Sequence, residues 1–334
     1  MSKTKKIQLK DIAEEANVST ALVSYVLNGR HLNRIKKETA DRIKEVAKRL
    51  NYRPNHFAKG LKTQKSNTIG LILADLDNPF STQITRIIES ELLSYKYNVL
   101  IGSTYEKEDK FKELIEVFIN RQVDGLIILP TENSKIEIER LHSTNFPYVL
   151  MDRYFPNTSF NYIVNDNYFS TYSATKQLIK NNRKKIGFIT LQSNLFHIIE
   201  RKRGFIKACK EAEITTENMV KEIRLAHFDE DVAKEIDALR QEYTDLDAIL
   251  FSTDRLTMYG LKYMIQHQLN ITNNIEIMAV DEAKFYDIYS SPISYYKQPL
   301  EEMGQKAVQF LISKINENNS DIIQETVTGE LVIK

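Results

Sequence analysis

Glycine is scarce in this sequence, and its spacing excludes several classes of enzyme. The 334 residues include ten glycines, and the closest pair, Gly60 and Gly70, stands ten positions apart. A dinucleotide-binding GxGxxG loop and a phosphate-binding GxxxxGK loop both need closer glycines, so neither is present. The six histidines form no HExxH or other paired metal-ligand spacing, and no GxSxG nucleophile motif occurs. We therefore expect a protein that is not an enzyme and that uses no cofactor and no metal.

Cysteine occurs once, as Cys209, so an internal disulfide is excluded. Its place in an amphipathic helical pattern favours a buried, inert thiol, which suits a reducing compartment. Residues 1–16 are basic but lack the apolar run of a signal peptide, and no apolar stretch approaches membrane-spanning length. The single cysteine and the lack of a signal peptide or a membrane-spanning stretch predict a soluble, cytoplasmic protein that has no membrane partner.

The net charge is also small, only +1, but its distribution is uneven. Residues 1–65 hold sixteen Lys and Arg against six Asp and Glu, which gives +10, whereas the remainder carries −9. A compact basic module on an acidic body is the electrostatic pattern of nucleic-acid binding. A solvated basic tail is the alternative, but apolar residues recur at helical spacing throughout this segment, which favours a folded module.

The basic segment contains three short helical patterns, LKDIAEEAN, VSTALVSYVLN and KKETADRIKEVAKRLNY. A tight turn joins the first two, which predicts a helix-turn-helix whose second helix enters the major groove of DNA. Apolar residues fill one side of that second helix, and Ser19 stands at its N-cap position. The other side is small and polar. Its candidate DNA contacts are Ser19, Ser24 and Asn28 to phosphates, and Thr20, Ala21 and Tyr25 to base edges.

From Asn67 onward, apolar strand-like runs alternate with helical patterns. Seven runs are apparent: TIGLILA, NVLIGS, DGLIILP, YVLMD, KIGFITL, DAILFS and IEIMAVD. Continuous apolar strands separated by helices predict parallel sheets that are covered on both faces. This number of strands suits two doubly wound α/β subdomains better than one.

Polar residues stand just past the ends of these runs, which is where sheets of this kind bind ligands. Singly, each is more often a helix cap or a loop residue, but as a set they predict a binding cleft. Phe80 is either an apolar wall of that cleft or a core residue. The strand-end residues are Asp75 to Ser81 (with Asn78, Phe80 and Ser81 as the candidate contacts), Asp152 and Arg153, Thr190, Thr253 and Asp254, and Asp281. Phe251, at the end of its apolar run, is a further candidate.

Several runs together carry a resemblance to a known family. IQLKDIAEEANVSTALVSYVLN, ETADRIKEVAKRLNYRPN, AKGLKT and NTIGLILADLDNPF resemble the lactose-repressor family of bacterial transcription regulators, and the likeness covers essentially the whole chain. The resemblance implies a helix-turn-helix domain over 1–54, a hinge helix and linker over 55–66, and a periplasmic-binding-protein-like body over 67–334. Tyr25 departs from the Arg or His that relatives often carry.

The resemblance assigns further DNA contacts to the hinge. There, Leu61 matches an apolar residue that wedges into the minor groove and kinks the duplex. The residues before it complete the expected DNA-binding set: Asn55, His56 and Ala58. The partner implied is a near-palindromic stretch of double-stranded operator DNA, bound by a homodimer.

In the body, the resemblance implies a small effector in the cleft between the subdomains, usually a sugar or another metabolite. Arg201 in RKRGF and Asp281 in VDE match ligand-contacting positions. A guanidinium and a carboxylate suit hydroxyl-rich ligands, since both make charge-assisted hydrogen bonds. NLFHIIE, just before Arg201, suggests an extended loop whose Phe196 or His197 touches the ligand. Thr253 replaces the Asn that is frequent before the following Asp.

The expected division of the body follows the same resemblance. The first subdomain is expected at 67–165 and 297–319, and the second at 166–296 and 320–334. Two alternatives remain open: a regulator of this fold that is controlled mainly by a partner protein or a non-sugar metabolite, and a solute-binding protein. The latter would need an export signal and would not need the basic module.

Overall fold

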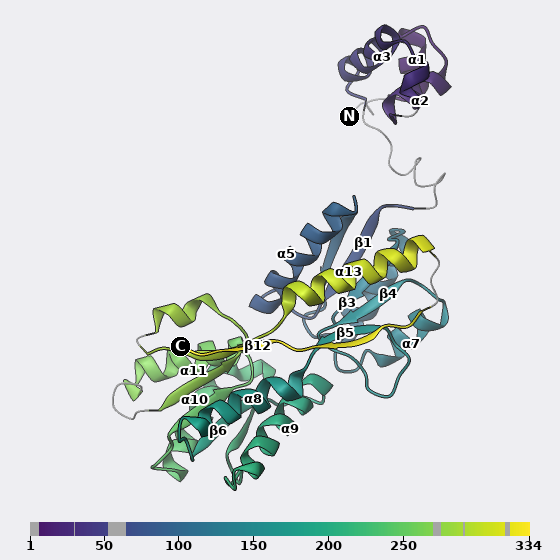
Figure 1. Ribbon diagram of the computed structural model, residues 1–334. Coiled ribbons are helices and arrows are strands. Elements are labelled where there is room, and N and C mark those ends of the chain that lie inside the picture. The colour runs from purple at the N-terminus through teal and green to yellow at the C-terminus, as the bar shows by residue number, and fades with distance from the viewer. Residues whose placement is uncertain (1–6, 30, 53–64, 270–274, 290, 318–320) are drawn as a thin grey trace. The chain divides into compact units, whose positions relative to one another are not determined.

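The computed structural model describes residues 7–29, 31–52, 65–269, 275–289, 291–317 and 321–334. The chain divides into two compact units, Met1–Gln64 and Lys65–Lys334 (Figure 1). Each unit is described by itself below.

The N-terminal unit is a bundle of short helices, as the apolar spacing predicts. It contains α1 (Leu9–Glu15), α2 (Thr20–Leu27), the 3₁₀ turn η1 (Leu32–Arg34) and α3 (Lys37–Arg49). Ser19 caps α2, because its side-chain oxygen accepts a hydrogen bond from the amide of Leu22 at 3.2 Å. The helices enclose a small apolar core: Ile12, Ala13, Ala16, Val23, Val26, Ala40, Ile43, Val46 and Ala47. The expected helix-turn-helix is confirmed.

The larger unit contains a first, fully parallel sheet with the strand order β11-β5-β4-β3-β1-β2. Its strands are β1 (Thr68–Leu73), β2 (Asn98–Ser103), β3 (Gly125–Ile128), β4 (Tyr148–Met151), β5 (Tyr162–Asn165) and β11 (Gln324–Val327). Helices α5 (Pro79–Ser94) and α13 (Leu300–Glu317) lie together over one face, as Figure 1 shows. Helices α6 (Glu108–Asn120) and α7 (Lys135–Ser143) pack on the other.

A second sheet has the order β12-β10-β9-β8-β6-β7, and only β12 runs antiparallel to its neighbour. Its strands are β6 (Ile186–Leu191), β7 (Val220–Ile223), β8 (Ala248–Phe251), β9 (Glu276–Val280), β10 (Ser294–Lys297) and β12 (Glu330–Val332). Helices α10 (Phe228–Glu242) and α11 (Asp254–Gln266) cover one face, and α8 (Asn167–Lys180) and α9 (Phe196–Glu211) the other. The short turns η2 (Leu225–His227) and η3 (Lys284–Ile288) complete it. The expected pair of doubly wound subdomains is confirmed.

The last segment of the chain differs from the expected division. The expected division places residues 320–334 in the second subdomain, but β11 pairs in parallel with β5 of the first sheet, with Gln324 opposite Tyr162. The chain then passes to the second sheet, where β12 pairs with β10 (Figure 1). This segment therefore supplies one edge strand to each sheet. The sequence signal is weak because both strands are short and half exposed.

The segment before Arg201 also differs from expectation. NLFHIIE is not an extended loop, because α9 begins at Phe196. The amide of Ile198 donates to the carbonyl of Leu195 at 3.0 Å, which closes the first turn. Ile198 and His197 are buried against the body, so packing on the sheet favours the helix here. Further along α9, Cys209 is wholly buried, and burial raises the pKa of its thiol to about 12, as expected of an inert cysteine.

Candidate functional sites

The first candidate site is the polar side of α2. Thr20, Ala21, Tyr25 and Asn28 are exposed, whereas Ser24 is half-buried. The side-chain amide of Asn28 donates to the carbonyl of Ser24 at 2.8 Å, so part of its hydrogen-bonding capacity closes the end of the helix. The structure therefore leaves a small, polar helix face open to solvent, with Val23 and Val26 buried beneath it.

The ring of Tyr25 stands edge-on to His31, with ring centroids 5.1 Å apart. This contact holds the largest side chain of the face near the end of α2. The four hinge candidates, Asn55, His56, Ala58 and Leu61, lie outside the described residues.

The second candidate site lies in the larger unit, where both sheets present the carboxyl ends of their strands. One cavity of about 390 Å³ is lined by residues of both subdomains, among them Phe80, Asp254, Asp281 and Gln298. A second cavity of about 290 Å³ is lined on one side by Asp75, Asn78, Glu106 and Arg153, and on the other by Thr253 and Arg255. The expected cleft between the subdomains therefore exists as two adjoining spaces, with consecutive residues of α11 contributing to each.

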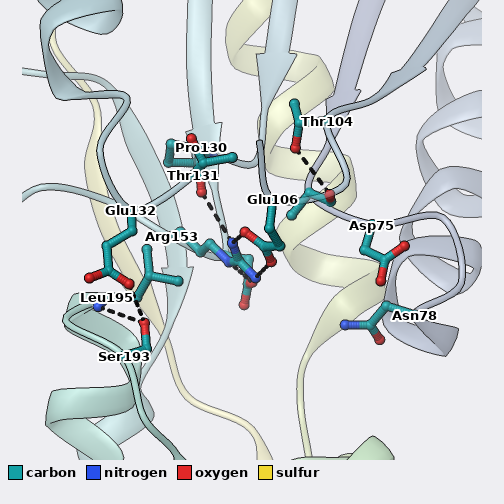
Figure 2. Close-up of polar contacts among 12 residues, drawn as sticks. Asp75, Asn78, Thr104, Glu106, Pro130, Thr131, Glu132, Arg153, Ser193 and Leu195 are labelled. Atoms are coloured by element: carbon teal, nitrogen blue, oxygen red, sulfur yellow. Dashed lines mark hydrogen bonds and ion pairs between the residues drawn. The ribbon is translucent and has the colours of Figure 1, made fainter. Parts of the chain in front are cut away.

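Figure 2 shows the residues of the first subdomain at this site, together with Ser193 and Leu195 of the second. The guanidinium of Arg153 faces the carboxylate of Glu106 in a two-pronged ion pair, with N–O distances of 2.7 and 2.9 Å. Arg153 also donates to the carbonyl of Pro130 at 3.3 Å, and its Nε lies 3.8 Å from Asp152. Arg153 is thus held in place by its own subdomain.

Asp152 follows β4 and is buried, with a positive φ of 65° that turns the chain sharply after the strand. Burial raises the pKa of its carboxyl to about 6, against the opposing effect of Arg153 and Arg201. At this carboxyl, burial therefore outweighs the two nearby cations.

Arg201 extends from α9 into the interior and is almost wholly buried. Its Nε donates to Asn167 Oδ1 at 2.8 Å, and its Nη1 donates to the carbonyl of Ser252 at 2.5 Å. These bonds join α9 to the start of α8 and to the end of β8. Arg201 lines neither cavity, so it acts on the site through the residues that it holds.

Asp281 lies at the end of β9 with a positive φ of 81°. Its carboxylate accepts a hydrogen bond from the side-chain amide of Gln298 and another, at 3.4 Å, from the backbone amide of Asp254. Burial, and then the neighbouring Asp281 carboxylate, raise the pKa of Asp254 to about 7. Two carboxyl groups thus share this end of the larger cavity.

Contacts also run from one subdomain to the other. Arg255 of α11 forms an ion pair with Asp75 at 3.2 Å. At another point, Glu132 accepts hydrogen bonds from Ser193 Oγ at 2.8 Å and from Asn194 Nδ2 at 2.7 Å (Figure 2 draws the Ser193 side). The predicted residue Phe196 packs edge-on against Tyr154, with centroids 5.2 Å apart. These polar and aromatic contacts connect the two subdomains beside the cavities.

The predicted ligand-binding set is brought together only in part. Asn78, Phe80, Thr253 and Asp281 line the cavities. Asn78 and Thr253 also cap α5 and α11, accepting from the amides of Phe80 and Leu256 at 3.0 and 3.2 Å. The candidates that line neither cavity are Ser81, Asp152, Thr190, Phe196, Arg201 and Phe251.

Phe251 is a clear correction. It is wholly buried in the core of the second subdomain, and its ring lies against Gly260 of α11. It belongs to the hydrophobic core because successive residues of β8 point to opposite faces of the sheet. Three further strand-end residues of the predicted set also line the cavities, Asp75, Arg153 and Asp254, whereas the sequence gives no signal for lining residues such as Glu106, Arg255 and Gln298.

Buried polar atoms without a hydrogen-bond partner gather at this same edge of the sheets. Within the described ranges they include Ser103 Oγ, Thr131 Oγ1, Arg153 Nε, Thr190 Oγ1, His197 Nδ1, Ser252 Oγ and Gln298 Oε1. All but His197 lie at or just past the carboxyl end of a strand. A buried polar atom without a partner is costly, so such a cluster indicates a site where a ligand supplies the partners.

Over the residues that the structure describes, no cluster of His, Cys, Asp and Glu has the arrangement of a metal site. The same residues include no helix long and apolar enough to cross a membrane.

A basic helix-turn-helix unit with an open polar face, followed by a two-subdomain body with a polar cleft, defines a DNA-binding transcription regulator with a ligand-binding domain. The chain belongs to the lacI family of bacterial regulatory proteins. The family model for periplasmic binding proteins and the sugar-binding domain of the LacI family matches residues 66–332. A second family model, for bacterial regulatory proteins of the lacI family, matches residues 8–55.

Individual relatives align along almost their whole length. The ribose operon repressor of Haemophilus influenzae is 29% identical over 95% of this chain and 95% of its own length. Catabolite control protein A of Priestia megaterium is 26% identical over 94% of each chain. Among solved structures, the Lac repressor bound to ONPG has a TM-score of 0.85 at 20% identity and covers 98% of this chain and 99% of its own.

Proposed function

We propose that this regulator binds a near-palindromic operator as a homodimer, and that a small hydroxyl-rich effector in the cleft of the larger unit sets its operator affinity. The DNA contacts proposed are the exposed residues of α2 together with the hinge residues, in a domain of residues 1–54 and a hinge of 55–66. The small side chains Thr20 and Ala21 let the backbone approach base edges, and Tyr25 supplies a longer polar reach.

One observation carries the effector proposal: the cluster of buried polar atoms without hydrogen-bond partners at the strand ends. Those on Thr131, Thr190 and Ser252 are hydroxyl oxygens, which can both donate and accept. A hydroxyl on a ligand can likewise donate and accept. Either hydroxyl, that of the protein or that of the ligand, can therefore be the donor in the hydrogen bond between them. Asp281 adds a carboxylate that accepts from ligand hydroxyls with the extra strength of a charged acceptor.

Relatives of this fold carry chemically different ligands. One structure is a complex with cellobiose, and another is a complex with fructose 1-phosphate. Likeness of fold therefore does not select a ligand for this chain, and the residues of its own cleft have to do so.

The proposal is tested by finding a ligand and measuring its effect on DNA binding. A thermal-shift screen of sugars identifies compounds that raise the melting temperature, because a ligand that binds only the folded state stabilises it by mass action. Gel shifts with and without the compound then measure the change in operator affinity. Linkage requires that operator change the affinity for the ligand by the same factor.

A variant locates the site of that effect. Asp281→Asn is expected to bind operator normally but to need about tenfold or more ligand for the same response, because a charged acceptor is lost. Asp287→Asn is the matched control, since Asp287 is an exposed carboxylate in η3 of the same subdomain. Equal ligand affinity in both variants would place the effector outside this cleft.

A further inference from the structure

The polar side of α2 carries one large ring, that of Tyr25. This side chain is 42% exposed, whereas Thr20 and Ala21 on the same side are small. Among the residues that the structure describes, none forms a hydrogen bond with the Tyr25 hydroxyl. That hydroxyl is therefore free to donate to a base edge or to accept from one. Because a side chain that turns freely loses conformational freedom when it binds, its reading of a base depends on what orients it.

His31 contacts this ring edge-on. The two ring centroids lie 5.1 Å apart, and the angle between the ring planes is 85°. An edge-to-face arrangement of this kind is favoured for two aromatic rings, because the positive edge of one meets the negative face of the other. Each ring also occupies space beside the other. The contact with His31 therefore restricts the orientations that are open to Tyr25.

The backbone holds His31 in place beside the end of α2. His31 has a φ of 54° and Gly29 a φ of 67°, so both lie in the left-handed region. Histidine is one of the few residue types with a side chain that adopt this conformation readily. The carbonyl of His31 accepts a hydrogen bond from the amide of Arg34 at 2.9 Å, which closes the turn η1. The position of the His31 ring is thus set by a defined turn.

The contact between Tyr25 and His31 lies outside the core of the N-terminal unit. That core is built from apolar side chains, and neither of the two rings is part of it. Both residues are exposed. A surface pair of this kind adds little to stability, so its effect is mainly on the shape of the surface that α2 presents.

We propose that His31 is a positioning residue for operator reading, which holds the Tyr25 ring in one orientation so that its hydroxyl addresses one base pair in each half-site. This inference rests on the proposed function, since it concerns how α2 contacts the operator. It extends that function by assigning part of the sequence preference to a residue that follows the helix. The turn after α2 then affects which duplex is chosen, and not only how tightly any duplex is held.

The test uses the full-length protein and does not require a known operator. Each protein selects duplexes from a pool of randomised DNA, and sequencing of the bound fraction gives the preferred base at every position. Gel shifts then measure affinity for the duplex that the parent selects and for duplexes with one base pair replaced. The variants are His31→Asn, Tyr25→Phe and the two combined. Asn has no ring but tolerates the left-handed backbone of residue 31.

Tyr25→Phe should weaken the preference at one position of each half-site, because it removes the hydroxyl. His31→Asn should weaken the preference at that same position by about two- to tenfold, the range that an aromatic pair implies. In the combined variant, His31→Asn should add nothing to the effect of Tyr25→Phe, since it acts through the same group. Asn33→Ala is the matched control and should keep the preference of the parent, because Asn33 is an exposed residue of the same turn.

An unchanged base preference in His31→Asn overturns the inference. An equal loss of affinity for every duplex, with a weaker salt dependence, also overturns it and makes His31 a direct phosphate contact. A clearly lower melting temperature of His31→Asn would instead make the residue part of the fold. If Tyr25→Phe changes the preference at no position, the proposed contact of α2 fails and the inference fails with it.

Discussion

Replacing Arg201 with Leu removes the most deeply buried positive charge among the cleft residues and keeps most of the side-chain volume. In the parent, Arg201 makes two hydrogen bonds, at 2.8 and 2.5 Å. It also lowers the pKa of Asp152 and of Asp254, both of which burial raises. Breaking a buried charge network by removing one partner costs about 3–5 kcal/mol. We expect a loss of unfolding free energy in this range near pH 8.

The loss of unfolding free energy in Arg201→Leu should depend on pH. The two buried carboxyl groups determine whether it grows or shrinks as the pH rises. In the folded protein the pKa is about 6 for Asp152 and about 7 for Asp254, whereas an unfolded Asp has a pKa of about 3.9. The folded state therefore binds more protons between these values, and the two carboxyls destabilise it increasingly as pH rises from about 4 to 7. Removing Arg201 raises both folded pKa values further, so the variant loses more stability than the parent over that rise.

At pH 5 both carboxyls are largely neutral, and the cost of Arg201→Leu falls to the lost hydrogen bonds, about 1–3 kcal/mol. Urea denaturation of the body at pH 5 and pH 8 measures the difference. Arg203→Leu is the control, because Arg203 lies on the same helix, is exposed, and makes only surface contacts in the described residues, an ion pair with Glu200 and a cation–π contact with Tyr168. We expect that control to change stability by less than about 0.5 kcal/mol at either pH. An Arg201→Leu cost that is the same at both pH values would refute the electrostatic reasoning.

Three further predictions concern other parts of the chain. Operator affinity should fall about 10³-fold or more between 50 and 200 mM salt, as expected for some six or more phosphate contacts, and a salt-independent affinity in gel shifts would contradict DNA binding by the basic unit. Leu61→Ala should lower operator affinity and DNA bending without changing the melting temperature, and an early-melting variant with normal bending would make Leu61 a core residue. Gly260→Ala should cost about 1–3 kcal/mol of unfolding free energy, because the added Cβ meets the ring of Phe251. A melting temperature equal to that of the parent would show that the ring moves aside freely.

The helix-turn-helix could be predicted from sequence because its determinants are local. The polar and apolar sides of α2 are separated by helical periodicity, and the hydroxyl of Ser19 caps the helix three residues before its bonding partner. Strands β7, β11 and β12 lack such a signal. Each is short, lies at or near the edge of a sheet and mixes polar with apolar residues, as in the Val220–Ile223 run VKEI. They become strands only because a neighbouring strand offers a backbone to pair with.

The sequence predicts which loops form the candidate cleft, but it predicts less well which of their side chains line it. Parallel topology brings the carboxyl ends of strands together, so residues after β4, β8 and β9 meet wherever their side chains point. Which of them line a cavity depends on contacts that span the chain. Arg201 is drawn to Asn167 and Ser252 and lies behind the cavities, while Gln298, which carried no motif, donates to Asp281 within one of them.

The same contacts explain why such a cleft can be selective. Thr190 and Ser252 each keep a buried hydroxyl without a partner, and each such group costs about 1–3 kcal/mol. A ligand that bonds to both recovers that cost when it binds, whereas a ligand that lacks one matching hydroxyl leaves a donor or acceptor buried and unpaired. Discrimination between closely related sugars then follows from the number of matched hydroxyls.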